Sequence, residues 1–260
     1  MMLLLLVACQ GPSLSPTPVE GWRLTWADEF DAAEGEGPAE PWGFDEGATG
    51  WGNAELQSYT RDNALHNGEG QLVITAREEA VEGAAYTSAR LNTKGRFAQQ
   101  YGRFEARLRV PAGQGLWPAF WLLGADIDTV GWPTCGELDA MEVRGAEPET
   151  VQSAAHGLGF SGGASIYDSI TLDEGSLADD FFTYAVQIDE GRVSFWFDDQ
   201  RVMDLTAADL PEGSAWPFDK PMFPIVNLAV GGTFGGDPDE TTVFPAELVV
   251  DHVRVYARGD

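Results

Sequence analysis

The chain has 260 residues, of which 43% are hydrophobic and 11% aromatic, and its formal net charge is −27 from 42 acidic and 15 basic residues. The apolar content is sufficient for a large core, which excludes general disorder. A net charge this negative repels phosphate backbones. We therefore expect no nucleic-acid partner. The sequence has no glycine-rich nucleotide loop and no His/Cys cluster, and we therefore expect no cofactor for catalysis.

The first 21 residues differ in character from the rest of the chain. Residues 1–8 form an apolar run that is too short to span a bilayer and is similar to the core of a secretory signal. A Ser/Pro/Thr tether follows. Leu6-Val7-Ala8-Cys9 resembles the lipobox of bacterial lipoproteins, in which the cysteine becomes lipid-modified. We therefore expect an exported protein that is extracellular or lipid-anchored at the bacterial cell surface through Cys9.

Alternation of apolar and polar residues dominates the remainder of the chain, residues 22–260. Such alternation is typical of half-buried β-strands, and the segment RVSFWFDDQRVMDL predicts a hairpin. Helical periodicity is limited to a short turn near residues 207–209. No linker or internal repeat interrupts the pattern, so we predict one all-β domain, an antiparallel sandwich. The clearest strand segments, in chain order, are residues 71–78, 102–110, 192–205 and 248–257.

The stretch CGELDAMEVRG holds three carboxylates, Glu137, Asp139 and Glu142, within six residues. Side chains alternate between the faces of a regular strand, so Glu137 and Asp139 share one face and Glu142 points to the other. A β-bulge adds one residue to a strand and redirects the side chains that follow it. With Ala140 or Met141 as the added residue, all three carboxylates point into one cleft.

Three carboxylates on one face suit glycoside hydrolysis, in which one carboxylate attacks and another is held protonated as the acid. The spacing alone leaves two other interpretations open. One is a solvated acidic strand face, and the other is a divalent-cation site, although the loop pattern of an EF-hand is missing. We interpret Cys135 as a small buried neighbour of Glu137 rather than a nucleophile, because no Cys–His pairing is suggested.

Beyond GELDAME, further blocks occur in the order found in the laminarinase-like branch of glycoside hydrolase family 16, which the chain resembles. The resemblance covers nearly everything from Trp22 onward. It implies a β-jelly-roll of two antiparallel sheets, with a substrate cleft on the concave face and residues 22–260 as the catalytic domain. The blocks are WADEF, GWGNAELQSYT, YTSARLNTKG, GRFEARLRVPAGQGLWPAFWLLG, WPFDKPMFPIVNLAVGG and VDHVRVYA.

The function implied by this resemblance is endo-acting hydrolysis of β-1,3-glucan, of the laminarin type, by a retaining mechanism. Glu137 matches the family's nucleophile, and Glu142 matches its general acid/base. Asp139 matches the residue that hydrogen-bonds the nucleophile and helps to set its protonation. We expect a monomer whose partner is the polysaccharide substrate.

The resemblance also implies sugar-binding residues. Trp117 and Trp121 lie four residues apart, so in a strand they point the same way and suit an aromatic floor, although two tryptophans on one strand face are more often core. Glu55 fits a cleft contact and a strand-surface charge equally well. Phe234 departs from the family pattern, where we expect tryptophan. The other implied sugar-binding residues are Asn53, Arg90, Trp132 and His156.

A structural calcium ion is the last feature that the resemblance implies. The matching positions are Glu29, a backbone carbonyl near Gly70, and Asp251, away from the cleft. Oxygen ligands of this kind suit a hard cation.

Three alternative functions occur among proteins of this fold. Mixed-linkage glucanases of this fold usually have the unbulged spacing Glu-x-Asp-x-Glu, which this chain lacks. Agar and carrageenan hydrolases share the bulged spacing, so the motif alone does not exclude a marine galactan as substrate. A non-catalytic β-glucan-binding protein usually lacks one or both glutamates, whereas all three acids are present here.

Overall fold

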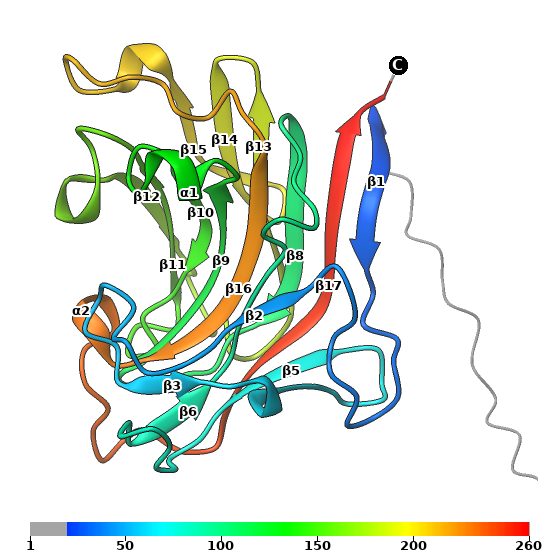
Figure 1. Ribbon diagram of the computed structural model, residues 1–260, viewed down its shortest axis with the longest axis vertical. Helices are drawn as coiled ribbons and strands as arrows, with labels where there is room; N and C mark the ends of the chain where they lie inside the picture. The colour runs from blue at the N-terminus through cyan, green and yellow to red at the C-terminus, as the bar shows by residue number, and fades with distance from the viewer. Residues whose placement is uncertain (1–19, 260) are drawn as a thin grey trace, which may run out of the picture.

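The computed structural model describes residues 20–259, and within that range two large antiparallel sheets pack face to face (Figure 1). One described sheet has eight strands: β15 (Gln200–Thr206), β14 (Arg192–Phe197), β13 (Phe182–Asp189), β8 (Gly102–Arg109), β17 (Ala246–Arg258), β5 (Leu72–Ala76) and β4 (Ala64–His66) in spatial order, with β1 (Trp22–Asp28) also paired to β17. The other has seven: β12 (Ile166–Thr171), β11 (Thr150–His156), β10 (Glu137–Glu142), β9 (Leu116–Gly124), β16 (Met222–Val230), β7 (Arg90–Asn92) and β2 (Gly43–Asp45).

The remaining elements of the described part are short. Strands β3 (Gln57–Tyr59) and β6 (Tyr86–Ser88) form a small parallel pair. The helical elements are α1 (Ile127–Val130), α2 (Gly232–Gly235) and the 3-10 turns η1 (Arg61–Asn63), η2 (Gly162–Ala164) and η3 (Ala207–Asp209). None of the helices within residues 20–259 is long and apolar enough to cross a membrane.

The period-two patterns of the sequence account for the strands. In β5, Leu72, Ile74 and Ala76 are buried and alternate with partly exposed residues. Strands β14 and β15 form the expected hairpin, whose turn begins at Asp198 with a φ of 48°. The short helical turn near residue 207 is present as η3. The predicted all-β antiparallel sandwich is therefore confirmed.

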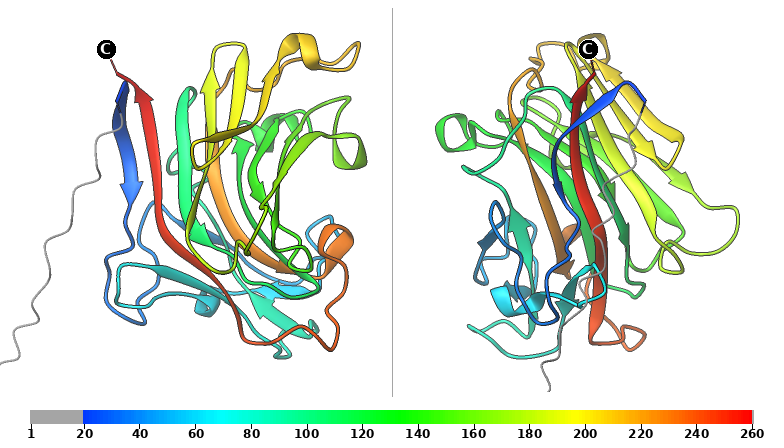
Figure 2. Two further views of the ribbon diagram at one scale, coloured as in Figure 1. Left: turned by 180° about the vertical axis from the view of Figure 1, so that it is seen from behind. Right: turned by 90° about the vertical axis from the view of Figure 1, so that its right-hand side faces the viewer.

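The hydrophobic core lies between the inner faces of the two sheets. Phe104 and Leu108 of β8 and Leu138 of β10 are fully buried there. Burying a side chain of this size contributes about 1.5–3 kcal/mol. The long strand β17 pairs with β8, β5 and β1, and Figure 2 shows β17 in red beside β1 in blue. The eight-stranded sheet thus packs against the inner face of the seven-stranded sheet.

The seven-stranded sheet is curved, and its outer face is concave. Strands β9 and β16 bend together in Figure 1, with α1 near one end of the pair and α2 near the other. All nine residues of β16 are buried. Met222, Val226 and Leu228 of this strand pack in the core, whereas Asn227 lies on the concave face.

The predicted lipobox with Cys9, and residues 10–19 of the tether, lie outside the described residues. The division of the chain into residues 1–21 and 22–260 stays a prediction.

Candidate active site

A β-bulge interrupts β10 in the middle of the acidic motif. Against β9, the Cα partners of Asp139 and Met141 are the consecutive residues Trp121 and Phe120, so Ala140 is the extra residue. The register with β11 shifts over the same interval. The predicted bulge is therefore present, with Ala140 as the inserted residue and its side chain fully buried.

The bulge brings the third carboxylate back to the face of the first two. Glu137, Asp139 and Glu142 all line one cavity of about 290 Å³ on the concave sheet. Leu138, between the first two acids, is fully buried in the core. The interpretation of the motif as a solvated acidic face is wrong, because Asp139 is only 4% exposed.

Gly136 sets the entry of the chain into β10. Its φ of +76° lies in the left-handed region that L side chains rarely adopt. A Cβ at this position would lie 3.0 Å from the side chain of Pro217. A glycine therefore fits the close approach that starts the strand directly before Glu137.

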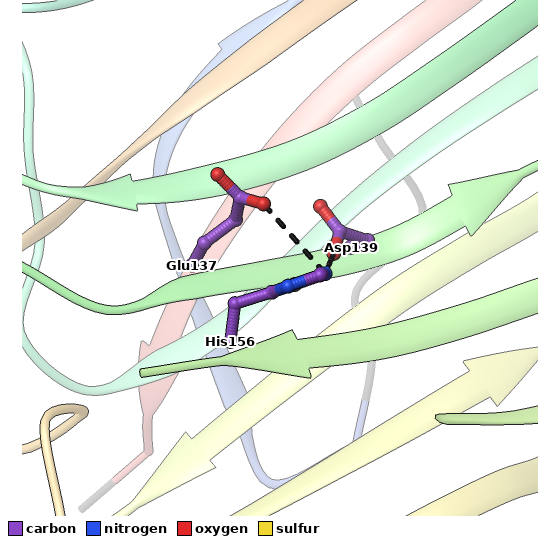
Figure 3. A group of neighbouring side chains, drawn as sticks. All are labelled: Glu137, Asp139 and His156. Atoms are coloured by element: carbon purple, nitrogen blue, oxygen red, sulfur yellow. Dashed lines mark ion pairs between the residues drawn. The ribbon is translucent and has the colours of Figure 1, made fainter. Parts of the chain in front are cut away.

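His156 of β11 lies beside the two N-terminal acids of the motif (Figure 3). Its Nε2 is 3.0 Å from Oδ2 of Asp139 and 3.7 Å from Oε1 of Glu137. The backbone N–H of Gly162 donates to Nδ1 at 3.2 Å. Because Nδ1 accepts that hydrogen bond, the neutral ring has its proton on Nε2, facing the carboxylates.

This tautomer bears on the interpretation of the motif as a cation site. Ligand atoms of Glu137, Asp139 and His156 lie within 4.8 Å of one another. A metal-binding histidine presents a nitrogen lone pair. Here the neutral ring has its proton on Nε2, so this nitrogen offers no lone pair to a metal ion.

Burial and mutual repulsion keep protons on the acidic cluster. Burial is the main cause that raises the pKa of Glu137 to about 8, and the charge of Asp139 adds to it. The same two causes, in the same order, raise the pKa of Glu142 to about 8. Burial also holds the pKa of Asp139 well above its ordinary value. The three carboxyls therefore do not all ionise together, and the cluster keeps at least one proton near neutral pH.

Two tryptophan side chains hold the glutamates. The indole N–H of Trp132 donates to Oε2 of Glu137 at 3.1 Å. The indole N–H of Trp117 donates to Oε1 of Glu142 at 3.0 Å and lowers the pKa of that carboxyl, in opposition to burial. Each glutamate is thereby fixed in orientation by an aromatic ring that also lines the cavity.

Arg90 packs against the aromatic side chains that line the cavity. Its guanidinium lies 4.7 Å above the ring of Trp121 and 5.2 Å from that of Trp51. Its Nε is 2.9 Å from Oδ2 of Asp45. The indole N–H of Trp121 donates to Oδ1 of Asn227 at 2.8 Å, so this ring too is fixed in place.

Glu55 is the centre of a buried hydrogen-bond network in the wall of the cavity. It is 9% exposed and lines the cavity. It accepts hydrogen bonds from Asn53 at 3.0 Å, Gln57 at 2.7 Å and Tyr59 at 3.0 Å. Of its two interpretations from sequence, the cleft contact is therefore right and the surface charge is wrong.

The comparisons with known proteins agree with this geometry. Residues 52–244 match the family described as "Glycosyl hydrolases family 16". The chain belongs to glycosyl hydrolases family 16. The resemblance found from the sequence is confirmed, and the protein is a glycosidase of a family that needs no cofactor for catalysis.

Several members of family 16 are similar over nearly the whole chain. A "Beta-glucanase" of Rhodothermus marinus is 42% identical over 90% of this chain and 85% of its own. The endo-beta-1,3-glucanase structure from Pyrococcus furiosus is 42% identical, with a TM-score of 0.88 over 92% of this chain and 95% of that one. The laminarinase catalytic domain from Thermotoga maritima is 44% identical, with a TM-score of 0.87 over 93% and 100%. The predicted jelly-roll is confirmed by these family 16 neighbours.

The family 16 fold brings the predicted sugar-binding residues together. Five of them line the cavity, namely Asn53, Arg90, Trp117, Trp121 and Trp132. The sixth, His156, contacts the carboxylates from the neighbouring strand as described above.

Sequence reasoning missed other residues of the cavity. Asn227 lies in it, and its Nδ2 also donates to the buried hydroxyl of Tyr59 at 3.2 Å. Its signal was a single amide within the apolar run PMFPIVNLAV. Trp51 belongs to the block GWGNAELQSYT, whose resemblance implies a role for Asn53 but not for this tryptophan. Ile127 and Leu123 complete the apolar lining, and nothing in the sequence distinguished them from core residues.

Cys135 is structural. It is fully buried and packs with Leu123, Phe223 and Ile225. Burial raises the pKa of its thiol to about 11, so the thiolate needed for nucleophilic attack is scarce near neutral pH. The interpretation as a small buried neighbour is confirmed.

The residues implied for calcium have other partners. The carboxylate of Glu29 accepts hydrogen bonds from Arg254 at 2.8 and 2.7 Å. Oδ2 of Asp251 lies 3.1 Å from Nη1 of Arg107. Gly70 contributes a backbone turn with a φ of 79°. Carboxylates that already neutralise arginines do not fit a cation site in this arrangement, and the calcium ion stays a prediction from resemblance.

Proposed function

We propose that the protein is an endo-acting β-1,3-glucanase that hydrolyses laminarin-type glucan with retention of anomeric configuration. The observation on which this rests is the bulge at Ala140, which brings Glu137 and Glu142 to one face of the cleft. The 42–44% identity to a beta-glucanase and to solved β-1,3-glucanases supports the substrate class.

In the first step of the proposed reaction, ionised Glu137 attacks the anomeric carbon and forms a covalent glycosyl ester. Glu142 gives its proton to the glycosidic oxygen as the bond to the leaving sugar breaks. When His156 is protonated, its positive charge lowers the pKa of Glu137 and so favours the ionised form of that carboxyl. Burial keeps the proton on Glu142 until it is needed.

In the second step, the now ionised Glu142 takes a proton from water, and the hydroxide that forms attacks the anomeric carbon. The ester to Glu137 breaks, the sugar leaves, and both carboxyls return to their starting protonation states. Asp139 acts through its neighbours, because its negative charge raises the pKa of both glutamates. Its Oδ2 lies 3.0 Å from Nε2 of His156.

Product sizing by chromatography tests this proposal. Purified protein is incubated in parallel with β-1,3-glucan, mixed-linkage β-glucan and agarose. Short β-1,3-oligosaccharides of mixed length, formed early from β-1,3-glucan, are expected. Faster cleavage of one of the other two polysaccharides would replace the proposed substrate with that one, and binding of uncut glucan would indicate a binding protein.

We also propose, from the sequence alone, that the chain is exported, is lipidated at Cys9 and acts as a monomer. Fractionation of cells that produce the full chain tests the lipid. We expect the wild type in the membrane fraction and Cys9→Ser in the soluble fraction; equal partition of the two would contradict lipidation. The chain has a mass of 28.1 kDa, and a mass of two or more times this value by light scattering would contradict a monomer.

A further inference from the structure

The cavity extends over the concave face on only one side of β10, the strand that carries the three acids. Its lining comes from β10, β9, β16 and β7 and from the loops beside them. The concave sheet continues on the other side of β10, through β11 to the edge strand β12 (Figure 1). If the proposed function holds, an endo-acting enzyme cuts within a chain, and the glucan must extend past the carboxylates over these two strands.

The strand register identifies the side chains that lie on this part of the face. Asp139 of β10 pairs with Ala154 of β11, which pairs with Tyr167 of β12. Residues directly opposite one another in an antiparallel sheet project to the same face. Tyr167 therefore shares the concave face with Asp139, two strand spacings or roughly 10 Å away.

The next row of the ladder has the same arrangement. Glu142 pairs with Gln152, which pairs with Ser169. The alternate residues of β12, Ile166 and Ile170, pack against the hydrophobic core. The two faces of β12 are thus assigned independently, and Tyr167 and Ser169 lie on the side of the cleft.

Two side chains on this face, those of Tyr167 and Gln152, make no side-chain hydrogen bond within the described residues. Tyr167 is 61% exposed and has no hydrogen-bond partner or aromatic neighbour within residues 20–259. The amide of Gln152, beside Glu142, likewise makes no side-chain hydrogen bond in that range, and it is only partly exposed. A flat exposed ring beside unengaged amide and hydroxyl groups has the composition of a sugar site.

We propose that Tyr167, with Gln152 and Ser169, binds the sugar residues of the glucan that lie beyond the carboxylates, on the side opposite the cavity. The ring of Tyr167 stacks on the apolar face of a sugar. Gln152 and Ser169 hydrogen-bond its hydroxyls. This face determines how many sugars extend past the cleaved bond, and so which bond of a short chain is cut.

A solvent-exposed tyrosine on an edge strand is also an ordinary surface feature. The two explanations differ in their consequences for the cleavage pattern. A surface tyrosine affects no bond of the substrate. A stacking tyrosine favours the binding frame that places a sugar over β12, and its loss shifts cleavage to frames that do not.

The test uses a β-1,3-linked hexasaccharide labelled with ¹⁸O at its reducing end, so that mass spectrometry of the products identifies the bond that was cut. The full chain is compared with Tyr167→Ala, with Tyr167→Phe, which keeps the ring, and with Leu24→Ala, which removes an exposed apolar side chain from β1 in the other sheet. Circular dichroism and the melting temperature establish that each variant is folded.

We expect Tyr167→Ala to move the main cleavage position by one sugar and to lower kcat/KM for the hexasaccharide by roughly 2- to 10-fold, the range for loss of one aromatic contact. Tyr167→Phe and Leu24→Ala are expected to keep the wild-type pattern. An unchanged pattern and rate in folded Tyr167→Ala, with active wild type, overturns this inference alone. A wild type that cuts neither the hexasaccharide nor β-1,3-glucan overturns the proposed function as well.

Discussion

The indole N–H of Trp117 donates a 3.0 Å hydrogen bond to Oε1 of Glu142, and the same ring lies 5.0 Å from the ring of Phe234. The guanidinium of Arg144 lies 3.8 Å from the centroid of Phe234 on α2. Three packed side chains therefore support the orientation of the carboxyl that we propose as the general acid/base. Phe234, which departs from the family pattern, keeps the aromatic packing that this support requires.

Replacing Trp117 by phenylalanine removes the donor and keeps an aromatic ring. The hydrogen bond from Trp117 lowers the pKa of Glu142, so its loss raises that pKa further. We expect the alkaline limb of the pH–rate profile to move to higher pH and kcat to fall by roughly 10-fold, because Glu142 loses its fixed orientation. The measurement is kcat against pH on β-1,3-glucan. An unshifted alkaline limb would exclude this hydrogen bond as a determinant of the acid.

Loss of either glutamate should remove hydrolysis of the polysaccharide. We expect Glu137→Ala and Glu142→Ala each to lower turnover by roughly 10²-fold or more. An aryl β-1,3-oligoglucoside separates the two roles, because its phenolate leaves without protonation. Glu142→Ala should still release a burst of phenol from this substrate, whereas Glu137→Ala should not. A burst from Glu137→Ala instead would reverse the assignment.

Asp139→Asn removes a negative charge between the two glutamates. That charge raises the pKa of both Glu137 and Glu142, so its removal lowers both pKa values. We therefore expect both limbs of the pH–rate profile to move to lower pH, with a smaller loss of kcat than in the glutamate variants. The profile of kcat/KM for the same substrate is the measurement, and a shift to higher pH would contradict the coupling.

The buried acid costs stability at high pH. The folded state raises the pKa of Glu142 from 4.5 to about 8, so it binds the proton more tightly than the unfolded chain does. The stability that this contributes is present below pH 4.5 and is lost as the pH rises towards 8. We expect Glu142→Gln to be more stable than the wild type by ~1–2 kcal/mol at pH 8, with little difference at pH 4.5.

Thermal melts at the two pH values measure this effect, at roughly 2–4 °C per kcal/mol for a domain of this size. Asp168→Asn on β12, an exposed acid remote from the buried cluster, is the control and should shift the melting temperature equally at both pH values. A Glu142→Gln variant that is stabilised more at pH 4.5 than at pH 8 would contradict the raised pKa.

Local patterns were sufficient to predict the fold and the central motif. Alternation in β5 and β8 identified strands because each has one face in the core. The spacing of Glu137, Asp139 and Glu142 implied a bulge, because in a regular strand the first two point to one face and the third points to the other. Such arguments need only neighbouring residues, which a sequence displays directly.

The rest of the site depends on contacts between residues far apart in the chain. The link from Trp121 to Asn227 spans 106 positions, and the one from Asn227 to Tyr59 spans 168. The proton on Nε2 of His156 follows from a backbone contact with Gly162 in the next loop. No periodicity records these pairings, so only the folded chain reveals that Glu55 is buried and bonded.

The central claim is that the reaction passes through a covalent intermediate on Glu137, with Glu142 as the acid that helps to form it and the base that helps to hydrolyse it. Proton NMR of the first reducing sugars released from a β-1,3-oligosaccharide tests it most directly. A double displacement predicts that the β-anomer appears first and the α-anomer only later, by mutarotation. Initial formation of the α-anomer would mean single displacement by water, and would contradict the role assigned to Glu137.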